Sequence, residues 1–344
     1  MTNLILAYDT ALAYWSRQDA TMPQSALSIP SANAALSSSA GSIKSPAIRR
    51  LRAHGAFEHL PCTLDLLTSN AGDHRKTSEA VIHSLSAPLP PRSLVRADAG
   101  IGVPALVCSP ECLFVQMACL MELAELIELG FELCGNYAVA PKAKDGMVER
   151  EPVTTPQRIA AYLAEADGMH GVKRARTAAR FILAGSKSPK ESQLAMLATL
   201  ERRYGGFGLE PPLLNQPLAL PPAAQEVVGQ PDIKPDLYWP RVSTVIEYDS
   251  NAHHVGTAEG EQDARRRTGY ELMGLGAITI TYGQLSCLAT IAAVLDGLAG
   301  KLGVIRRPNK RQLQVRSLLH RKLLYGPRRQ RFTDPSVVEQ EPEE

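Results

Sequence analysis

The order of apolar patterns between residues 186 and 286 constrains the fold of this chain most. A helical pattern opens at Ser188, a good helix cap, with Pro189 at the first helical position. Strand patterns follow, then an amphipathic helix over residues 261–273 and a buried, β-branched strand over residues 277–285. Helix, three strands, helix and strand within about a hundred residues favour a mixed sheet flanked by helices. The predicted class of this part is therefore α/β.

The 344 residues are enough for two ordinary domains. Residues 1–150 predict an α+β domain, in which strand patterns precede a helix over residues 110–137. Residues 16–50 are rich in Ser, Ala and Pro and predict a flexible loop inside that domain. Residues 151–185 predict a helical connector, which could belong to either neighbour. Residues 186–300 then form the α/β domain.

A tail with uneven charge, residues 301–344, completes the chain. Between Arg306 and Arg331 there are ten Lys or Arg residues and no acid, whereas the last few residues are rich in Glu. So dense a basic stretch could contact phosphate groups, or it could simply be a solvated helix and tail. The sequence favours neither reading.

Several protein classes are excluded by composition. No run of about 18 apolar residues occurs, so no transmembrane helix is predicted. The first residues lack a basic region and contain Asp9, so no secretory signal is predicted. The six cysteines are scattered, which speaks against a disulfide framework and for a reducing compartment. A cytoplasmic protein with no membrane partner is the prediction.

Three acids mark the candidate site. Asp236 lies in one strand pattern, and Glu247 and Asp249 lie in the next. Residues two apart on a strand point to the same face, so Glu247 and Asp249 project together, and a tight turn brings Asp236 beside them. A hard divalent cation such as Mg²⁺ would relieve their repulsion by accepting oxygen ligands. The alternative is that one acid faces solvent and another pairs with an arginine.

Five strings in this order resemble the PD-(D/E)XK nuclease superfamily, and in particular its small domains related to very-short-patch-repair endonucleases. The strings are SPKES, PDLYWP, VIEYDSNAHH, DARRR and LGAITIT. The resemblance covers about a hundred residues. It implies a restriction-endonuclease-like mixed sheet flanked by helices, and hydrolysis of phosphodiester bonds with Mg²⁺ or Mn²⁺.

The resemblance also implies roles for four acids. Asp236 and Glu247 match the two motif acids that hold the metal, and Glu191 matches an acid that such folds often add from the first helix. Asp249 stands where the superfamily usually has a lysine that orients the attacking water. We expect it to act as a further metal ligand, as in related domains with an E-x-D version of the motif.

Residues after the second strand complete the expected site. His253 or His254 would move a proton or order a metal-bound water, because the pKa of histidine is near neutrality. Arg266 and Arg267 are expected to contact phosphate. Asp263 and Arg266 lie three apart on one helix face, so they could close the site from the side or form an ordinary helix ion pair.

Two further segments bear on partners. Trp239 could stack on a base of a nucleic acid, although such an aromatic residue is more often packed in a core. The string VCSPECLFVQMACLMELAELIELGFELCGNY resembles the region that precedes nuclease-like domains in bacterial proteins related to AbiEi-type abortive-infection antitoxins. That resemblance implies a regulatory or binding role for residues 1–150.

The leading hypothesis is a metal-dependent nuclease of bacterial defence or of a toxin–antitoxin system. Its expected partners are nucleic acid, DNA rather than RNA, and a cognate regulatory protein. The alternative is a non-catalytic, antitoxin-like regulator or nucleic-acid-binding protein that keeps a nuclease scaffold. The missing lysine and the large N-terminal half favour this alternative.

Overall fold

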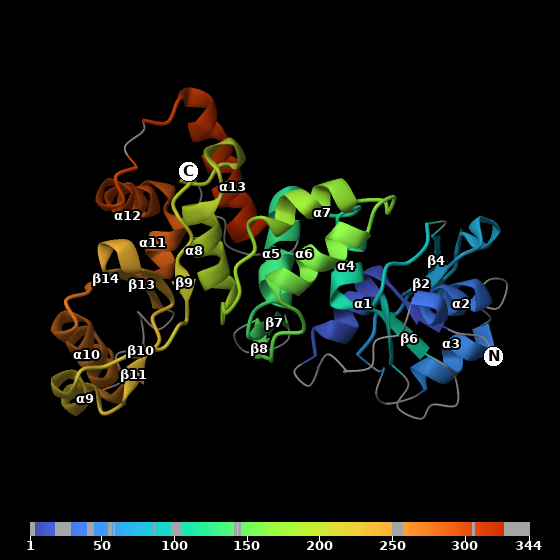
Figure 1. Ribbon diagram of the computed structural model, residues 1–344, viewed down its shortest axis with the longest axis horizontal. Helices are drawn as coiled ribbons and strands as arrows, with labels where there is room; N and C mark the ends of the chain where they lie inside the picture. Colours follow the sequence, from blue (N-terminus) through green and yellow to red (C-terminus); the bar gives the residue numbers. More distant parts are fainter. Residues whose placement is uncertain are drawn as a thin grey trace. The chain divides into compact units, whose positions relative to one another are not determined.

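A computed structural model divides the chain into two compact units (Figure 1). It describes residues 4–17, 29–39, 45–53, 57, 59–85, 87–97, 105–140, 143, 146–249, 257–304 and 307–326. The N-terminal unit contains Met1–Cys134, Ala138–Ala140 and Val148–Ile182, and the C-terminal unit contains the rest. Most of the expected helical connector, for which the sequence left both assignments open, therefore clusters with the N-terminal unit.

The N-terminal unit contains a six-stranded mixed sheet. Its strands are β1 (Leu4–Leu6), β2 (Leu64–Thr68), β3 (Arg75–Lys76), β4 (Ala80–Ser84), β5 (Leu94–Arg96) and β6 (Ala105–Cys108). They lie in the order β3-β4-β2-β1-β6-β5. The pairs β1–β6 and β2–β4 are parallel, and the other pairs are antiparallel. The strand patterns expected in this half are thus present.

Helices make up the remainder of the N-terminal unit. They are α1 (Tyr8–Trp15), α2 (Ile29–Ser39), α3 (Ser45–Arg52), α4 (Pro110–Met117), α5 (Leu123–Leu133), α6 (Pro156–Glu165) and α7 (Val172–Ala179), with a short 3-10 turn, η2 (Ala71–Asp73). The helices α2 and α3 correct part of the loop predicted over residues 16–50, of which residues 18–28 and 40–44 lie outside the described part of the chain. In α2, Ala32, Ala35 and Leu36 recur at helical spacing and are buried, an apolar stripe that the serine-rich composition obscured.

The helix predicted over residues 110–137 is two helices. The break falls between α4 and α5, where Glu122 and Glu125 form a capping box that starts a new helix. The backbone N–H of Glu122 donates to the Glu125 carboxylate at 2.9 Å. Apolar spacing continues across the break, so periodicity alone did not reveal it. Beyond α5, β7 (Tyr137–Val139) pairs with β8 (Met147–Glu149).

The C-terminal unit contains the predicted elements in the predicted order, with an additional helix over Pro222–Val228 that the sequence did not predict. Its main elements are α8 (Pro189–Thr199), β9 (Leu213–Leu214), β12 (Leu237–Trp239), β13 (Thr244–Asp249), α10 (Thr257–Leu272) and β14 (Gly276–Thr281). The four strands form one sheet in the order β14-β13-β12-β9. β13 is antiparallel to β12 and parallel to β14. The α/β class predicted for the chain is confirmed.

Smaller elements surround this sheet. They are η3 (Arg202–Tyr204), β10 (Leu218–Ala219), α9 (Pro222–Val228), β11 (Asp232–Ile233), η4 (Pro240–Val242), α11 (Tyr282–Ser286), α12 (Leu288–Lys301) and α13 (Lys310–Tyr325). The predicted strand over residues 277–285 is too long, because Thr281 and Gln284 form a capping box that starts α11. That strand is also less buried than expected, with Ile280 its only buried residue.

The tail predicted over residues 301–344 contains the helix α13, and residues 327–344 lie outside the described part of the chain. The six cysteines are all free. Within the described residues, no helix combines the length and apolar character needed to cross a membrane.

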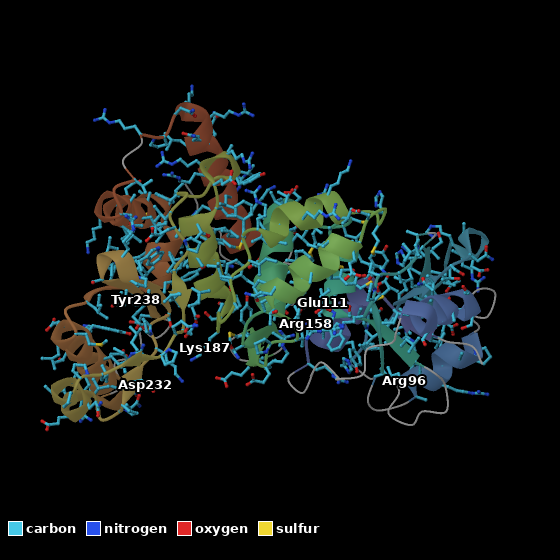
Figure 2. All side chains as sticks on the ribbon, in the orientation of Figure 1. Arg96, Glu111, Arg158, Lys187, Asp232 and Tyr238 are labelled. Carbon is cyan, nitrogen blue, oxygen red and sulfur yellow. The ribbon has the colours of Figure 1, made fainter. Side chains whose placement is uncertain are left out.

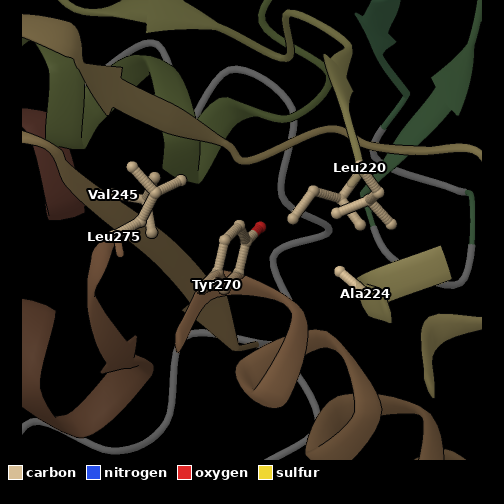
Figure 3. Close-up of a cluster of buried hydrophobic side chains, with 6 residues drawn as sticks. Leu220, Ala224, Val245, Tyr270 and Leu275 are labelled. Atoms are coloured by element: carbon tan, nitrogen blue, oxygen red, sulfur yellow. The ribbon is translucent and has the colours of Figure 1, made fainter. Parts of the chain in front are cut away.

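A hydrophobic cluster fixes α10 against β13 (Figure 3). Tyr270 of α10 lies among Leu220, Val245 and Leu275, and its side chain is almost fully buried. Val245 and Glu247 are two apart on β13, so their side chains leave the strand on the same face. The cluster therefore holds Tyr270 and its helix next to the acidic end of β13.

Candidate functional site

Two acids of the candidate site lie opposite each other, Asp236 directly before β12 and Glu247 on β13. Leu237 of β12 pairs with Ile246 of β13, so the next position in this register places Asp236 across from Glu247. A carboxylate oxygen of Asp236 accepts a hydrogen bond from the backbone N–H of Tyr248 at 2.7 Å. The turn η4 connects the two strands, as the sequence predicted.

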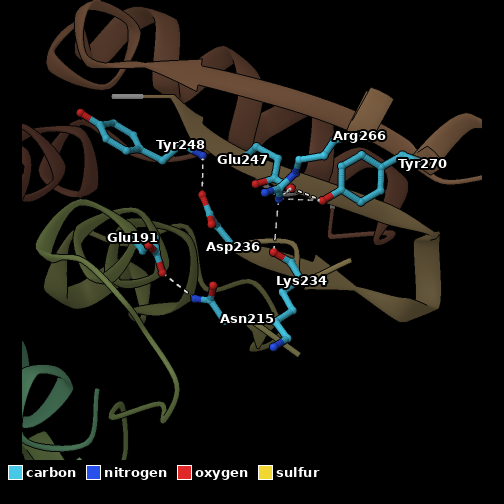
Figure 4. Close-up of polar contacts among 8 residues, drawn as sticks. All are labelled: Glu191, Asn215, Lys234, Asp236, Glu247, Tyr248, Arg266 and Tyr270. Carbon is cyan, nitrogen blue, oxygen red and sulfur yellow. Dashed lines mark hydrogen bonds and ion pairs between the residues drawn. The ribbon is translucent and has the colours of Figure 1, made fainter. Parts of the chain in front are cut away.

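Glu191 reaches the same region from the first turn of α8 (Figure 4). Ser188 caps this helix by accepting the backbone N–H of Glu191 at 3.2 Å. The Glu191 carboxylate is buried and accepts the backbone N–H of Lys187 at 2.9 Å and the side-chain amide of Asn215 at 2.6 Å. These two donors fix the carboxylate within the turn that begins the helix.

Glu247 has two partners on α10. The Arg266 guanidinium donates to its carboxylate at 2.8 Å, and the Tyr270 hydroxyl donates to the same oxygen (Figure 4). Arg266 also donates to the backbone carbonyl of Lys234 at 3.3 Å. Arg266 thus forms an ion pair with Glu247 of β13, the pairing of a strand acid with an arginine that the sequence left open as the alternative.

The charged form of Asp236 is disfavoured in the folded protein. Its pKa lies well above the ordinary range because burial disfavours the carboxylate and because Glu191 and Glu247 add negative charge nearby. The N–H of Tyr248 and the charge of Arg266 oppose this shift without cancelling it. Asp236, just before β12, therefore interacts with Glu191 of α8 and with Glu247 of β13.

The pKa values of Glu191, Arg266 and Tyr270 are also shifted, by burial and by contacts within the same site. Burial raises the pKa of Glu191, and the N–H of Lys187 and the amide of Asn215 offset part of that effect. Burial disfavours the charged guanidinium of Arg266, but Glu247 and Tyr270 more than compensate and raise its pKa. Burial and the Glu247 charge raise the pKa of the Tyr270 hydroxyl, which stays a hydrogen-bond donor at neutral pH.

The shift at Asp236 predicts how stability depends on pH in the absence of divalent cations. An unfolded aspartate loses its proton near pH 3.9, whereas folded Asp236 holds its proton to higher pH. The folded state binds more protons between these two values, so the free energy of unfolding should fall as pH rises through that window. The slope can reach about 1.4 kcal/mol per pH unit for one proton.

Urea denaturation of the wild type and of Asp236→Asn between pH 4 and pH 7, in EDTA, measures this contribution. The stability of the wild type relative to the variant should decrease as pH rises. A relative gain of wild-type stability with rising pH would contradict the assignment of the shift to Asp236.

An open pocket adjoins these residues. We call it the acidic pocket. It has a volume of about 200 Å³, and its charged lining residues are Asp236, Glu247, Asp249, Asp263, Arg266 and Arg267. Two of the predicted metal ligands, Asp236 and Glu247, are thus brought together, and Asp249 lines the same pocket. As the side chains stand, no group of three or more His, Cys, Asp or Glu residues in the described part of the chain is arranged to hold a metal ion.

The remaining site predictions concern the two histidines and Trp239. His253 and His254 lie outside the described residues. The idea that Trp239 stacks on a base is corrected, because its side chain is 0% exposed. Its indole N–H donates to the backbone carbonyl of Glu210 at 2.8 Å, so the ring is packed as part of the core.

Sequence reasoning missed Tyr270 and Asn215. Tyr270 lies four residues after Arg266, a spacing that places both side chains on one face of a helix and so offered a usable signal. Asn215 gives no such signal, because its contact with Glu191 joins residues 24 apart in the sequence.

With this geometry described, comparison with known proteins adds no relative. No protein-family model, curated protein or solved structure matches the chain.

Proposed function

We propose that the C-terminal unit is a metal-dependent nuclease that hydrolyses phosphodiester bonds, with DNA as the first substrate to test. The observation that carries this proposal is the group formed by Glu191, Asp236 and Glu247. Three elements bring these carboxylates together, and the pKa of Asp236 is raised beside an open pocket. Acids with strongly shifted pKa values beside a pocket are characteristic candidates for functional sites.

The element order around the site supports the proposal. Apart from β10, α9 and β11, the order α8, β9, β12, β13, α10, β14, with Asp236 just before β12 and Glu247 on β13, is the arrangement expected of a restriction-endonuclease-like domain. We propose this fold for the C-terminal unit on that basis. A defence or toxin–antitoxin role, with the N-terminal unit as the regulatory part, remains part of the same proposal.

The residues fit a hard divalent cation by their chemistry. Asp236, Glu247 and Asp249 offer carboxylate oxygens at the acidic pocket, the ligands that Mg²⁺ and Mn²⁺ prefer. A bound ion would neutralise these acids and polarise a phosphodiester. Glu247 would have to exchange at least part of its pairing with Arg266 for the ion.

The protein's own side chains would then position the substrate. Arg266 lies beside Glu247 and lines the acidic pocket, so its released guanidinium can hold a phosphate oxygen with paired N–H donors. Exposed Arg267 lines the same pocket and can hold a second oxygen. Tyr270 keeps the Glu247 carboxylate in place through its hydroxyl, and Asn215 does the same for Glu191.

One observation favours the alternative function. Glu247 is already paired with Arg266 and Tyr270, so its charge is compensated without a metal ion. A binding protein that keeps a nuclease scaffold and does not cleave would need no more than this. The alternative is therefore a regulator that recognises nucleic acid through the same surface.

A cleavage assay on the full chain separates the two functions. Labelled single-stranded and double-stranded DNA and RNA are incubated with Mg²⁺ or Mn²⁺, using the wild type and an Asp236→Ala, Glu247→Ala double variant. We expect cleavage by the wild type to fall at least about a hundredfold in the variant. Cleavage that persists in the variant would exclude this site, and cleavage by neither protein would favour the regulator.

A further inference from the structure

A second pocket adjoins the acidic pocket and shares two residues with it, Asp236 and Arg266. We call it the cationic pocket. Its volume is about 280 Å³, and its other charged lining residues are Lys187, Asp232 and Lys234. Figure 2 labels two of them, Lys187 and Asp232, in the C-terminal unit. The two pockets therefore meet at the acid and the arginine on which the candidate site is centred.

The charge balance differs between the two pockets. Four acids and two arginines line the acidic pocket, whereas two acids, two lysines and one arginine line the cationic pocket. Acid-rich linings suit metal cations, and lysine and arginine suit phosphate oxygens. The boundary between the pockets thus separates a region suited to a cation from a region suited to an anion.

Both lysines are attached to the site through their backbones. The N–H of Lys187 donates to Glu191 at 2.9 Å, and the carbonyl of Lys234 accepts from Arg266 at 3.3 Å. Their side chains are exposed and line the cationic pocket. Figure 4 shows Lys234 close to Arg266, with its ammonium group extending away from the carboxylates. The backbones of the two lysines are therefore held beside the acids, and the charge of Lys187 acts on Glu191, whose pKa it lowers.

Amide side chains supply further polar groups. Asn215, Gln230 and Gln262 also line the cationic pocket. An amide presents both donors and acceptors, which can meet a sugar hydroxyl or the edge of a base. Cations together with amides match a nucleotide better than they match inorganic phosphate.

We propose that the cationic pocket binds the nucleotide next to the scissile bond, with Lys187 and Lys234 holding its phosphate. This inference rests on the proposed nuclease function. It makes the substrate a strand of at least two phosphodiester units, one in each pocket, with Arg266 between them. Lys187 and Lys234 are positioning residues that hold the strand in register with Asp236 and Glu247.

The test compares two double variants of the full chain. Lys187→Gln, Lys234→Gln removes the pair from the cationic pocket. Lys76→Gln, Lys173→Gln removes two exposed lysines of the N-terminal unit and changes the net charge equally. Affinity for a labelled oligonucleotide is measured by fluorescence anisotropy at several salt concentrations, in EDTA and with Ca²⁺. Circular dichroism and thermal unfolding check that each variant is folded.

We expect the Lys187→Gln, Lys234→Gln variant to bind the oligonucleotide at least about tenfold more weakly than the wild type. The slope of the logarithm of the binding constant against the logarithm of the salt concentration should be smaller in magnitude by about 1. The control variant should keep both values. Cleavage of the oligonucleotide should fall more than cleavage of a small aryl phosphodiester, which has no neighbouring phosphate.

The outcomes separate this inference from the proposed function. A wild type that cleaves DNA, together with a Lys187→Gln, Lys234→Gln variant that binds like the control, would overturn the pocket assignment and leave the nuclease intact. In another outcome, the wild type neither binds metal nor cleaves, while only the Lys187→Gln, Lys234→Gln variant loses affinity for the oligonucleotide. That result would support the contact of the two lysines with phosphate and would exclude the nuclease function. Equal losses in both double variants would mean that only net charge matters, and would overturn the inference.

Discussion

Asp236→Asn should lose affinity for Mg²⁺ or Mn²⁺ by about a hundredfold or more and yet be more stable than the wild type in EDTA. The pKa of Asp236 is raised by burial and by Glu191 and Glu247, so its charged form is disfavoured in the folded protein. Asparagine removes that charge and can still accept the hydrogen bond from Tyr248. It leaves one fewer anionic ligand for a hard cation.

Calorimetry and thermal unfolding measure the two effects on the same samples. In EDTA the variant should melt at a higher temperature than the wild type. Saturating Mg²⁺ should raise the melting temperature of the wild type only, because a ligand stabilises the state that binds it. When the cation is added, the difference in melting temperature between the variant and the wild type is therefore expected to shrink strongly or to change sign.

Asp167→Asn is a suitable control. Its side chain is 82% exposed and forms an ion pair with Arg176 in the N-terminal unit, so the same chemical change should cost little stability. It should leave metal binding unchanged. If Asp236→Asn bound the cation as tightly as this control does, Asp236 would not be a metal ligand.

Trp239→Ala should lower the free energy of unfolding of the C-terminal unit by about 3–5 kcal/mol. The indole is fully buried at the end of β12, and its N–H donates to the carbonyl of Glu210. Truncation leaves a cavity beside the strand that begins after Asp236 and also leaves the part-buried carbonyl of Glu210 without its donor. Urea denaturation followed by circular dichroism measures the loss.

Trp239→Phe separates the packing of the ring from its hydrogen bond. The smaller ring fills part of the space but cannot donate to Glu210, so this variant should be less destabilised than Trp239→Ala. If Trp239 stacked on a base instead, Trp239→Ala would retain its stability and lose only affinity for an oligonucleotide. That result would contradict the burial of the indole.

The C-terminal unit could be predicted well where its signals are local. Ser188 followed by Pro189 is a capping signal read within one turn, and α8 begins there. The two short strands on either side of η4 follow from apolar residues and a turn, and their pairing places Asp236 beside Glu247. Local signals failed where two patterns overlapped, as at Thr281, where a capping box ends β14.

The N-terminal unit was harder to predict, for a related reason. In α2, serine-rich composition indicated a loop, but the burial of Ala32 and Leu36 gives that helix its stability. The boundary between α4 and α5 depends on a side-chain contact between Glu122 and Glu125, which an apolar pattern does not contain. In both cases the deciding contact is not visible in the composition or the apolar spacing of the segment.

The amino-acid sequence by itself determined the α/β class, the start of α8 and the adjacency of Asp236 and Glu247, because caps, turns and strand periodicity act over a few residues. Only the tertiary structure decided the partners of those acids. Arg266 pairs with Glu247, Asn215 pairs with Glu191, and Lys187 and Lys234 line the cationic pocket beside them. These contacts join residues far apart in the sequence, so they depend on how α8, α10 and the sheet pack together, which no local pattern specifies.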